Sequence, residues 1–262
     1  KDCAGNFGVI EVDQSGRMIG FEEKPAVPKE IPGDPGYSLV SMGNYIFKTE
    51  VLSHELRVDA EDKESSHDFG KDIIPKLFPR GNVFVYDLSN NVIDGEPNEV
   101  YWRDVGSIDA YWDAHMDLLK DKAPFSLMNL KWALHTFYPP LPPAHFSDTA
   151  NNQSEVSQSM ISAGCNIDGA RIRKSVMGFR CTAEDGAQVE ETVLIGDVKI
   201  GANCKIRRAI IDRHVVLAPG FTLGYDKEAD MKIVTPDDKN GPQMSPNGII
   251  VIPKGMRLGF DE

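Results

Sequence analysis

The chain has 262 residues, 41% of them hydrophobic and 26% charged, which is enough for one large domain or two of moderate size. Its formal net charge of −12 argues against a general binder of nucleic acid or of anionic membranes, because both need an excess of basic residues. A phosphorylated substrate would therefore have to be bound by a few well-placed cations.

The cysteines and the hydropathy pattern indicate a cytoplasmic protein. Four cysteines, at positions 3, 165, 181 and 204, form no Cys-x-x-Cys pair, and the histidines have no metal-ligand spacing. Scattered cysteines of this kind are typical of buried residues in a reducing compartment. No apolar run is long enough to span a bilayer and no signal peptide is found, so we expect neither a membrane nor a nucleic-acid partner.

The first 125 residues alternate between strand-like and helix-like segments, which indicates a mixed α/β layer. Segments 7–12 and 18–22 flank a Gly-containing turn and predict a hairpin, and segments 39–47 and 82–87 predict further strands. A serine-capped start with Asp68 in its first turn predicts a short helix over 65–77. Ser107 followed by apolar residues at helical spacing predicts a second helix over 107–119.

Residues 126–150 are expected to form an extended linker. Four prolines crowd positions 139–143, and proline fixes the backbone in a stiff, extended path.

The C-terminal part, residues 151–262, repeats with a period of 17. Such a period predicts a triangular parallel β-helix, in which each coil directs an aliphatic residue inward from each of its three faces and uses small residues near its corners. A plain antiparallel meander is the alternative, although a fixed period would then be accidental. The apolar segment 248–253 is expected to cover an open end of the stack. The aliphatic series are 172, 189, 206, 223 and 176, 193, 210, and the small series is Ala170, Ala187 and Cys204.

Four segments in this order, followed by such a tail, resemble the ADP-glucose pyrophosphorylase (glucose-1-phosphate adenylyltransferase) family. The segments are FEEKP (21–25), SMGNYIF (41–47), SSHDFGKDIIP (65–75) and YWRDVGSIDAYWDAHMDL (101–118). The resemblance implies the second half of a Rossmann-like nucleotidyltransferase domain over 1–125 and a left-handed parallel β-helix domain for regulation or oligomerisation over 151–262. It also implies the family's reaction, in which ATP and glucose 1-phosphate give ADP-glucose and pyrophosphate for glycogen or starch synthesis.

The family's Gly-rich loop, which binds the nucleotide phosphates, is not found in this sequence, and the first residue is Lys1 rather than methionine. We therefore expect the chain to be part of a longer enzyme and to be inactive alone.

The resemblance assigns four residues to the sugar phosphate. Lys24 offers a compact cation with three donors for the phosphate of glucose 1-phosphate. Glu23 would accept hydrogen bonds from sugar hydroxyls. Ser41 would add a hydroxyl contact to the glucose ring, and Gly8 matches a glycine at which the backbone comes close to the sugar nucleotide.

The resemblance makes Asp104 a catalytic carboxylate that binds Mg²⁺. Nucleotidyl transfer needs a divalent cation that neutralises charge on the reacting phosphates, and Mg²⁺ is held by one or two carboxylates together with substrate phosphates. Lys24 and Asp104 are expected to face the same phosphate-sized space. Arg103 is expected to support the fold. His67 and Asp68 are interpreted as a helix start rather than a catalytic pair, because an anionic phosphate nucleophile needs no general base.

Members of the family are commonly tetramers controlled by small anionic effectors, so the resemblance implies a homotetramer with an allosteric site. Candidate effector-binding residues are Arg207, Arg208 and Arg213. The segment 230–247 departs from the arginine-rich stretch of fructose-bisphosphate-activated members, which puts the usual activator in doubt.

Three alternatives stay open. The first is a non-catalytic regulatory paralogue, and the second is a β-helix acyltransferase that uses His214. The third is a related nucleotidyltransferase with a different base or sugar.

Overall fold

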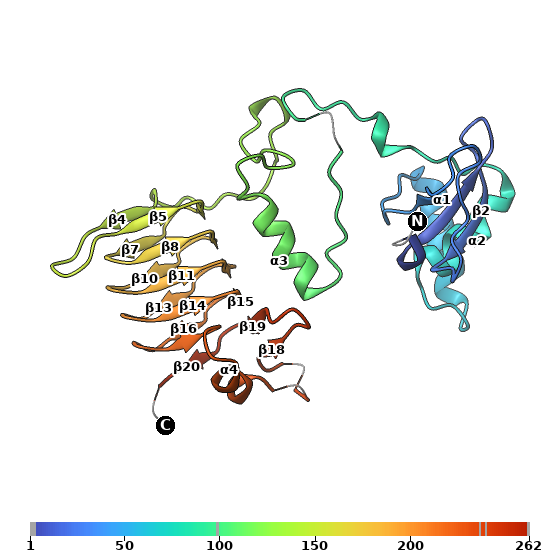
Figure 1. Cartoon of the computed structure of the whole chain (residues 1–262). Helices are drawn as coiled ribbons and strands as arrows, with labels where there is room; N and C mark the ends of the chain where they lie inside the picture. The colour runs from blue at the N-terminus through green and yellow to red at the C-terminus, as the bar shows by residue number, and fades with distance from the viewer. Residues whose placement is uncertain (1–3, 98–99, 236, 239, 261–262) are drawn as a thin grey trace. The chain divides into compact units, whose positions relative to one another are not determined.

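The computed structural model describes residues 4–97, 100–235, 237, 238 and 240–260 (Figure 1). The chain divides into two compact units, Lys1–Asn91 and Val92–Glu262, which are described separately. The division falls inside the region predicted as one nucleotidyltransferase domain, and the predicted domain boundaries stay predictions. No helix among the described residues has the length and apolar character needed to cross a membrane.

The first unit is built on a three-stranded antiparallel sheet, in the order β2-β1-β3. The predicted hairpin is confirmed. The strand predicted over 39–47 is confined to two residues, because the chain turns at Gly43 with φ of +71°. The strand predicted over 82–87 is reduced to a single bridge between Phe84 and Arg17. The strands are β1 (Gly8–Val12), β2 (Met18–Glu23) and β3 (Leu39–Val40).

One long helix and several short ones complete this unit. The long helix, α1, was not predicted. The helix predicted over 65–77 begins at Phe69 instead, because Asp68 rather than a serine is its N-cap. Buried Val9, Met18, Ile74 and Leu77 are part of the small core. The helices are η1 (Ala4–Asn6), α1 (Thr49–Glu61), η2 (Phe69–Ile73), α2 (Ile74–Leu77), η3 (Phe78–Arg80) and η4 (Leu88–Asn90).

The second unit is dominated by the predicted parallel β-helix, whose rungs are stacked in Figure 1. One sheet contains β4 (His145–Ser147), β7 (Asn166–Asp168), β10 (Thr182–Ala183), β13 (Lys199–Ile200), β16 (Val216–Leu217) and β20 (Arg257–Leu258). The next contains β5 (Glu155–Ser157), β8 (Arg171–Arg173), β11 (Gln188–Glu190), β14 (Lys205–Arg207) and β17 (Thr222–Leu223). The third contains β6 (Met160–Ile161), β9 (Val176–Met177), β12 (Val193–Leu194), β15 (Ala209–Ile211), β19 (Ile250–Ile252) and β18 (Gln243–Met244).

Residues 17 positions apart are paired between successive coils, so the period of 17 is the length of one coil. Ile172, Val189, Ile206 and Leu223 are successive partners in one parallel ladder, and at most 1% of each is exposed. Every coil therefore adds one aliphatic layer to the core, and the repeat arises because each layer must match the next in volume.

Truncating one of these layers should destabilise the unit. Ile206 is fully buried, so Ile206→Ala should lower the free energy of unfolding by about 2–5 kcal/mol through lost burial and the cavity left behind. Equilibrium denaturation measures the free energy of unfolding. Substitution of the adjacent exposed residue, Lys205→Ala, is the control and should change this free energy little. An equal loss of stability in both variants would contradict the assignment of Ile206 to the inward side.

The series at 176, 193 and 210 does not point inward, contrary to the prediction. Neighbouring residues of a strand face opposite sides, and on this sheet the inward positions are one residue later. Val193 and Ile210 instead lie under the helix α3 (Ile108–Asp117), which packs on the outside of the coils. The inward residues are Met177, Leu194, Ile211 and Ile252.

The segment 248–253 does not cover an open end, as had been predicted. Its strand β19 pairs in parallel with β15 and so continues the third sheet. An insertion between β17 and β19, containing α4 (Lys227–Ile233) and β18, interrupts the coil sequence before it resumes. The final strand is β20, which pairs with β16.

The proline-rich segment contains η5 (Leu130–Trp132) and then runs without regular structure to β4, which starts at His145 inside the predicted linker. Tyr138 packs edge-on against Phe179 of the coils, with ring centroids 5.3 Å apart. The segment therefore contacts the β-helix through the aromatic ring of Tyr138.

Candidate functional site

The four residues predicted to bind the sugar phosphate lie together at one end of the hairpin in the first unit. Gly8 and Glu23 are partners across β1 and β2. The carbonyl of Gly8 accepts a hydrogen bond of 2.7 Å from the amide of Ser41, and the amide of Lys24 donates to the carbonyl of Phe7 at 3.1 Å. Backbone pairing alone thus brings together residues from three separate sequence motifs.

The Glu23 carboxylate lies between two glycines. A Cβ atom on Gly8 would stand 2.9 Å from Glu23 Oε2 and 2.4 Å from the ring of Phe21, and one on Gly70 would stand 3.0 Å from the same carboxylate oxygen. The space beside Gly8 is thus taken by side chains of β2, and the glycines leave room for the half-buried carboxylate. Gly70 was not predicted as part of this site.

Lys24 is exposed and has an unusual backbone. Its φ is +48°, in the left-handed region, although it precedes Pro25, and a residue before proline favours extended backbone. Strain of this kind persists only where surrounding contacts impose it, and it is concentrated at functional sites. The ammonium group makes no ion pair with any carboxylate among the described residues, so its charge is available to a ligand.

Ser41 is held beside an aromatic cluster. Its hydroxyl lies 3.1 Å from the hydroxyl of Tyr45 and accepts a hydrogen bond from the amide of Gly43. Tyr45 stacks on Phe69 at 5.6 Å, and Phe47 lies 5.9 Å from the same ring. The cluster ties the segment after β3 to η2, which also carries Gly70.

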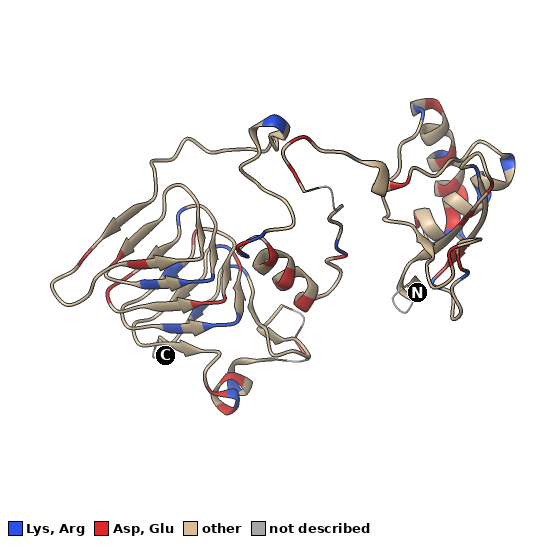
Figure 2. Ribbon diagram, turned by 45° about the horizontal axis from the view of Figure 1, so that its top comes forward, with Lys and Arg blue, Asp and Glu red and all other residues tan. Residues whose placement is uncertain are grey.

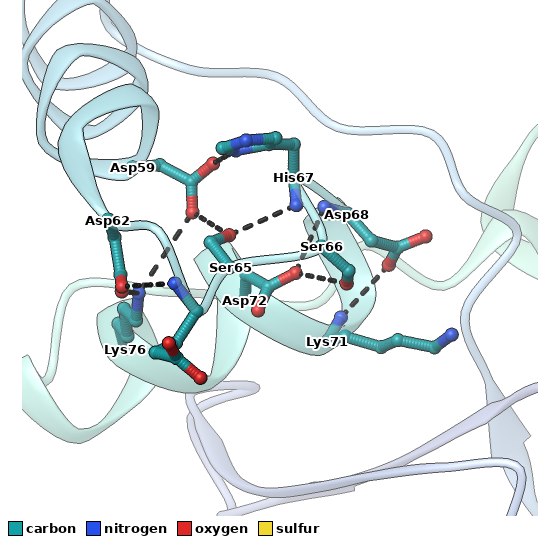
Figure 3. Close-up of polar contacts among 10 residues, drawn as sticks. Asp59, Asp62, Ser65, Ser66, His67, Asp68, Lys71, Asp72 and Lys76 are labelled. Atoms are coloured by element: carbon teal, nitrogen blue, oxygen red, sulfur yellow. Dashed lines mark hydrogen bonds and ion pairs between the residues drawn. The ribbon is translucent and has the colours of Figure 1, made fainter.

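A polar network holds the chain that leads into η2 (Figure 3). Asp59 at the end of α1 accepts a hydrogen bond of 2.6 Å from Ser65 and pairs with His67 at 2.8 Å. Asp68 accepts from the amides of Gly70 and Lys71, at 2.8 and 2.9 Å. His67 and Asp68 thus belong to a helix start, as interpreted from the sequence, with Asp68 rather than a serine as the N-cap and His67 paired with Asp59.

The Asp59 carboxylate should make stability depend on pH. Hydrogen bonds from Ser65 and His67 lower the pKa of Asp59 below its usual value of 3.8. Because the folded pKa is the lower one, the carboxylate stabilises the fold above the unfolded pKa and loses that effect as pH falls through the folded value. Asp59→Asn should therefore destabilise the chain at pH 7, and the gap to the unsubstituted chain should close below about pH 4. Denaturation at several pH values measures this, and a gap independent of pH would contradict it.

Asp104 belongs to the second unit, in the segment just before α3. It is exposed, and its Oδ1 accepts a hydrogen bond of 3.1 Å from the amide of Gly106. Arg103 instead pairs with Asp117 at 2.7 Å, which confirms its role in the fold. Ser107 caps α3 by accepting from the amide of Ala110, as predicted.

Among the described residues no group of three or more His, Cys, Asp and Glu could hold a metal ion. A lone exposed carboxylate such as Asp104 nevertheless fits Mg²⁺, which keeps several waters and takes its other ligands from substrate phosphates. Because Lys24 belongs to the other unit, a space shared by Lys24 and Asp104 stays a prediction.

The arginines predicted to bind effectors lie on the coils, where basic residues recur from rung to rung (Figure 2). Arg207 and Arg208 line a pocket of about 690 Å³ between the coils and the insertion, and Arg213 is not part of its lining. His214 is exposed, 3.9 Å from Asp197.

Comparisons with known proteins match both parts of the chain. A family model described as nucleotidyl transferase matches residues 2–121, and one described as GlmU-like, C-terminal hexapeptide matches residues 142–252. The chain is 57% identical over 257 residues to glucose-1-phosphate adenylyltransferase 1 of Vibrio vulnificus (strain CMCP6). It is 56% identical to a glucose-1-phosphate adenylyltransferase of Photobacterium profundum and 44% identical to one of Anaeromyxobacter sp.. The matches cover 97–98% of this chain, which spans 62% of the length of each of these three relatives.

Proposed function

We propose that the chain is part of a glucose-1-phosphate adenylyltransferase, and that the protein containing it joins glucose 1-phosphate to the adenylyl group of ATP. A phosphate oxygen of glucose 1-phosphate attacks the α-phosphorus of ATP, the bond from that phosphorus to the β-phosphate oxygen breaks, and pyrophosphate leaves. The observation that carries the proposal is the convergence of Lys24, Glu23, Gly8 and Ser41 at one end of the hairpin.

Each of these residues has a binding task in the proposal. The ammonium of Lys24 neutralises the phosphate of glucose 1-phosphate. Glu23, held in place between Gly8 and Gly70, accepts hydrogen bonds from sugar hydroxyls, and Ser41 adds a further hydroxyl contact. The phosphate nucleophile is already anionic at neutral pH, so the reaction needs orientation and charge neutralisation rather than a base.

Mg²⁺ is the proposed cofactor, with Asp104 as one protein ligand. When bound, the cation would neutralise charge on the reacting phosphates. Asp104 supports this role because its carboxylate is exposed and bonded only to the nearby Gly106 amide among the described residues. We further propose a homotetramer in the cytoplasm, with ATP and glucose 1-phosphate as substrates. The three cysteines free of disulfides among the described residues fit a reducing compartment.

We propose regulation by a small anionic effector, with Arg207, Arg208 and Arg213 as candidate ligands. The structure favours the first two, because they share a pocket.

The direct test is pyrophosphate release by the whole protein from ATP, glucose 1-phosphate and Mg²⁺. We expect release that needs all three. Replacing ATP with other nucleoside triphosphates, and glucose 1-phosphate with other sugar 1-phosphates, separates this reaction from one that uses a different base or sugar. No release under any combination would favour the non-catalytic paralogue.

A further inference from the structure

The carboxylate of Glu23 fits closely against the backbone of Gly70. A Cβ atom on Gly70 would lie 3.0 Å from Glu23 Oε2 and 3.5 Å from its Cδ, so one of the two groups would have to move. Gly70 is buried, and its φ lies outside the left-handed region, so the local backbone conformation does not require glycine. The missing side chain at position 70 therefore serves the contact with the carboxylate.

The backbone of Gly70 is fixed by its neighbours. Its amide donates a hydrogen bond of 2.8 Å to the side chain of Asp68, and the ring of Phe69 is stacked in the aromatic cluster. The turn before it contains His67 with φ of +58°, which pairs with the buried Asp59 at 2.8 Å (Figure 3). A methyl group added at position 70 would therefore displace the end of the flexible carboxylate side chain rather than the helix.

The other glycine beside this carboxylate is less suited to isolate the effect. A Cβ atom on Gly8 would lie 2.9 Å from the same oxygen of Glu23, but it would also collide with the ring of Phe21. At Gly70 the flexible carboxylate of Glu23 is the nearest group to an added Cβ. Substitution of Gly70 thus addresses the position of the carboxylate most directly.

We propose that Gly70 is a positioning residue that determines sugar specificity. By leaving room for the Glu23 carboxylate, it sets where that carboxylate meets the sugar hydroxyls, and so which sugar 1-phosphates the enzyme accepts. A carboxylate aligned with a hydroxyl discriminates strongly against a sugar that lacks this hydroxyl, whereas a displaced carboxylate does not. The inference rests on the proposed function, because it takes Glu23 as a ligand of the sugar.

Deoxyglucose 1-phosphates that each lack one hydroxyl test the specificity role in the whole enzyme. The ratio of kcat/KM for glucose 1-phosphate to that for an analogue measures the preference. In Gly70→Ala this preference should fall at least about 10-fold, and against the same analogues as in Glu23→Ala, since a hydrogen bond to a charged group is worth about that factor or more. KM for glucose 1-phosphate should change more than kcat. An unchanged preference in Gly70→Ala would overturn the proposal.

Gly20→Ala is the matched control. A Cβ atom on Gly20 would also crowd a carboxylate, that of Glu11, which is not one of the sugar-binding residues. This variant should keep the preference for glucose 1-phosphate. An equal fall in Gly20→Ala and Gly70→Ala would show that the effect is a general disturbance of the sheet and would contradict the proposal.

The double variant Glu23→Ala/Gly70→Ala tests whether Gly70 acts through Glu23. It should be no more impaired than Glu23→Ala alone, because the carboxylate that the methyl group displaces is then absent. A further fall by the full factor of Gly70→Ala would overturn the positioning role. Equilibrium denaturation should show that Gly70→Ala is no less stable than the unsubstituted enzyme, because a helix favours alanine over glycine. A loss of activity that follows a loss of folded protein would also overturn it.

A crystal structure of the Gly70→Ala enzyme tests the displacement without any turnover. We expect the Glu23 carboxylate to have left the gap between Gly8 and residue 70, with the backbone of η2 unmoved. A carboxylate in its original place would overturn the proposal. A displaced carboxylate in an enzyme that releases no pyrophosphate with any sugar 1-phosphate would refute the proposed function and leave the positioning of Glu23 by Gly70 standing.

Discussion

Lys24→Ala in the whole enzyme should raise the KM for glucose 1-phosphate about 100-fold or more while kcat changes little, since charged hydrogen bonds are worth about 1.5–3 kcal/mol each. The expected pattern follows from the role of Lys24. An interaction made equally in the ground state and the transition state contributes to binding and leaves the chemical step unchanged. Initial rates over a range of glucose 1-phosphate concentrations measure both constants.

Lys29→Ala is the matched control for this substitution. It removes a charge five residues further along the chain and breaks the exposed pair of Lys29 with Glu11, so it should leave KM within about 2-fold of its original value. An equal rise of KM in both variants would show that Lys24 acts through the overall electrostatic field of the protein. A fall in kcat at unchanged KM would instead place Lys24 in the chemical step.

Asp104→Asn should lower kcat about 100-fold or more and change the KM for glucose 1-phosphate much less, because a metal ion supplies several kcal/mol of charge stabilisation in the transition state. The stability of the chain should hardly change, since the side chain is exposed and its hydrogen bond to the amide of Gly106 is local. Steady-state kinetics at saturating Mg²⁺ and denaturation curves measure the two effects.

Asp121→Asn is the matched control, because Asp121 is an exposed carboxylate beyond the other end of α3. It should keep full activity. If Asp104→Asn were as active as this control, or if its loss of activity followed a loss of folded protein, Asp104 would not be the metal ligand.

The coils could be predicted from the sequence because each coil stacks on the previous one and therefore has a similar pattern of residues. The same repeat did not reveal which aliphatic series faces inward. Val193 and Ile210 are aliphatic and buried, as residues of the β-helix core are. They are buried by α3, however, a helix some 80 to 100 positions earlier in the chain. The sequence pattern indicates that a residue is buried, but the tertiary packing determines which element buries it.

The helix α1 was missed for a related reason. Its buried residues are Glu55 and Asp59, while Leu56 and Val58 are exposed, so the apolar pattern that identifies a helix is absent. Burial of Glu55 depends on Arg80, and that of Asp59 on the 65–67 segment. Pairs between such distant positions have no local signature.

The candidate site was predicted through motifs, and its supporting residues were not. Gly8, Glu23, Lys24 and Ser41 converge through strand pairing. Gly70 and the Tyr45–Phe69 stack, which hold Glu23 and Ser41 in place, lay inside quoted motifs but had no predicted role. Close approach of a glycine to a side chain from another strand is visible only in three dimensions.

A crystal structure of the whole enzyme with ADP-glucose and Mg²⁺ tests the central claim most directly. We predict the sugar-linked phosphate within hydrogen-bonding distance of Lys24 Nζ, glucose hydroxyls on the Glu23 carboxylate, and the metal on Asp104 beside the same phosphates. Sugar nucleotide bound elsewhere, with Lys24 and Asp104 both facing solvent, would contradict it.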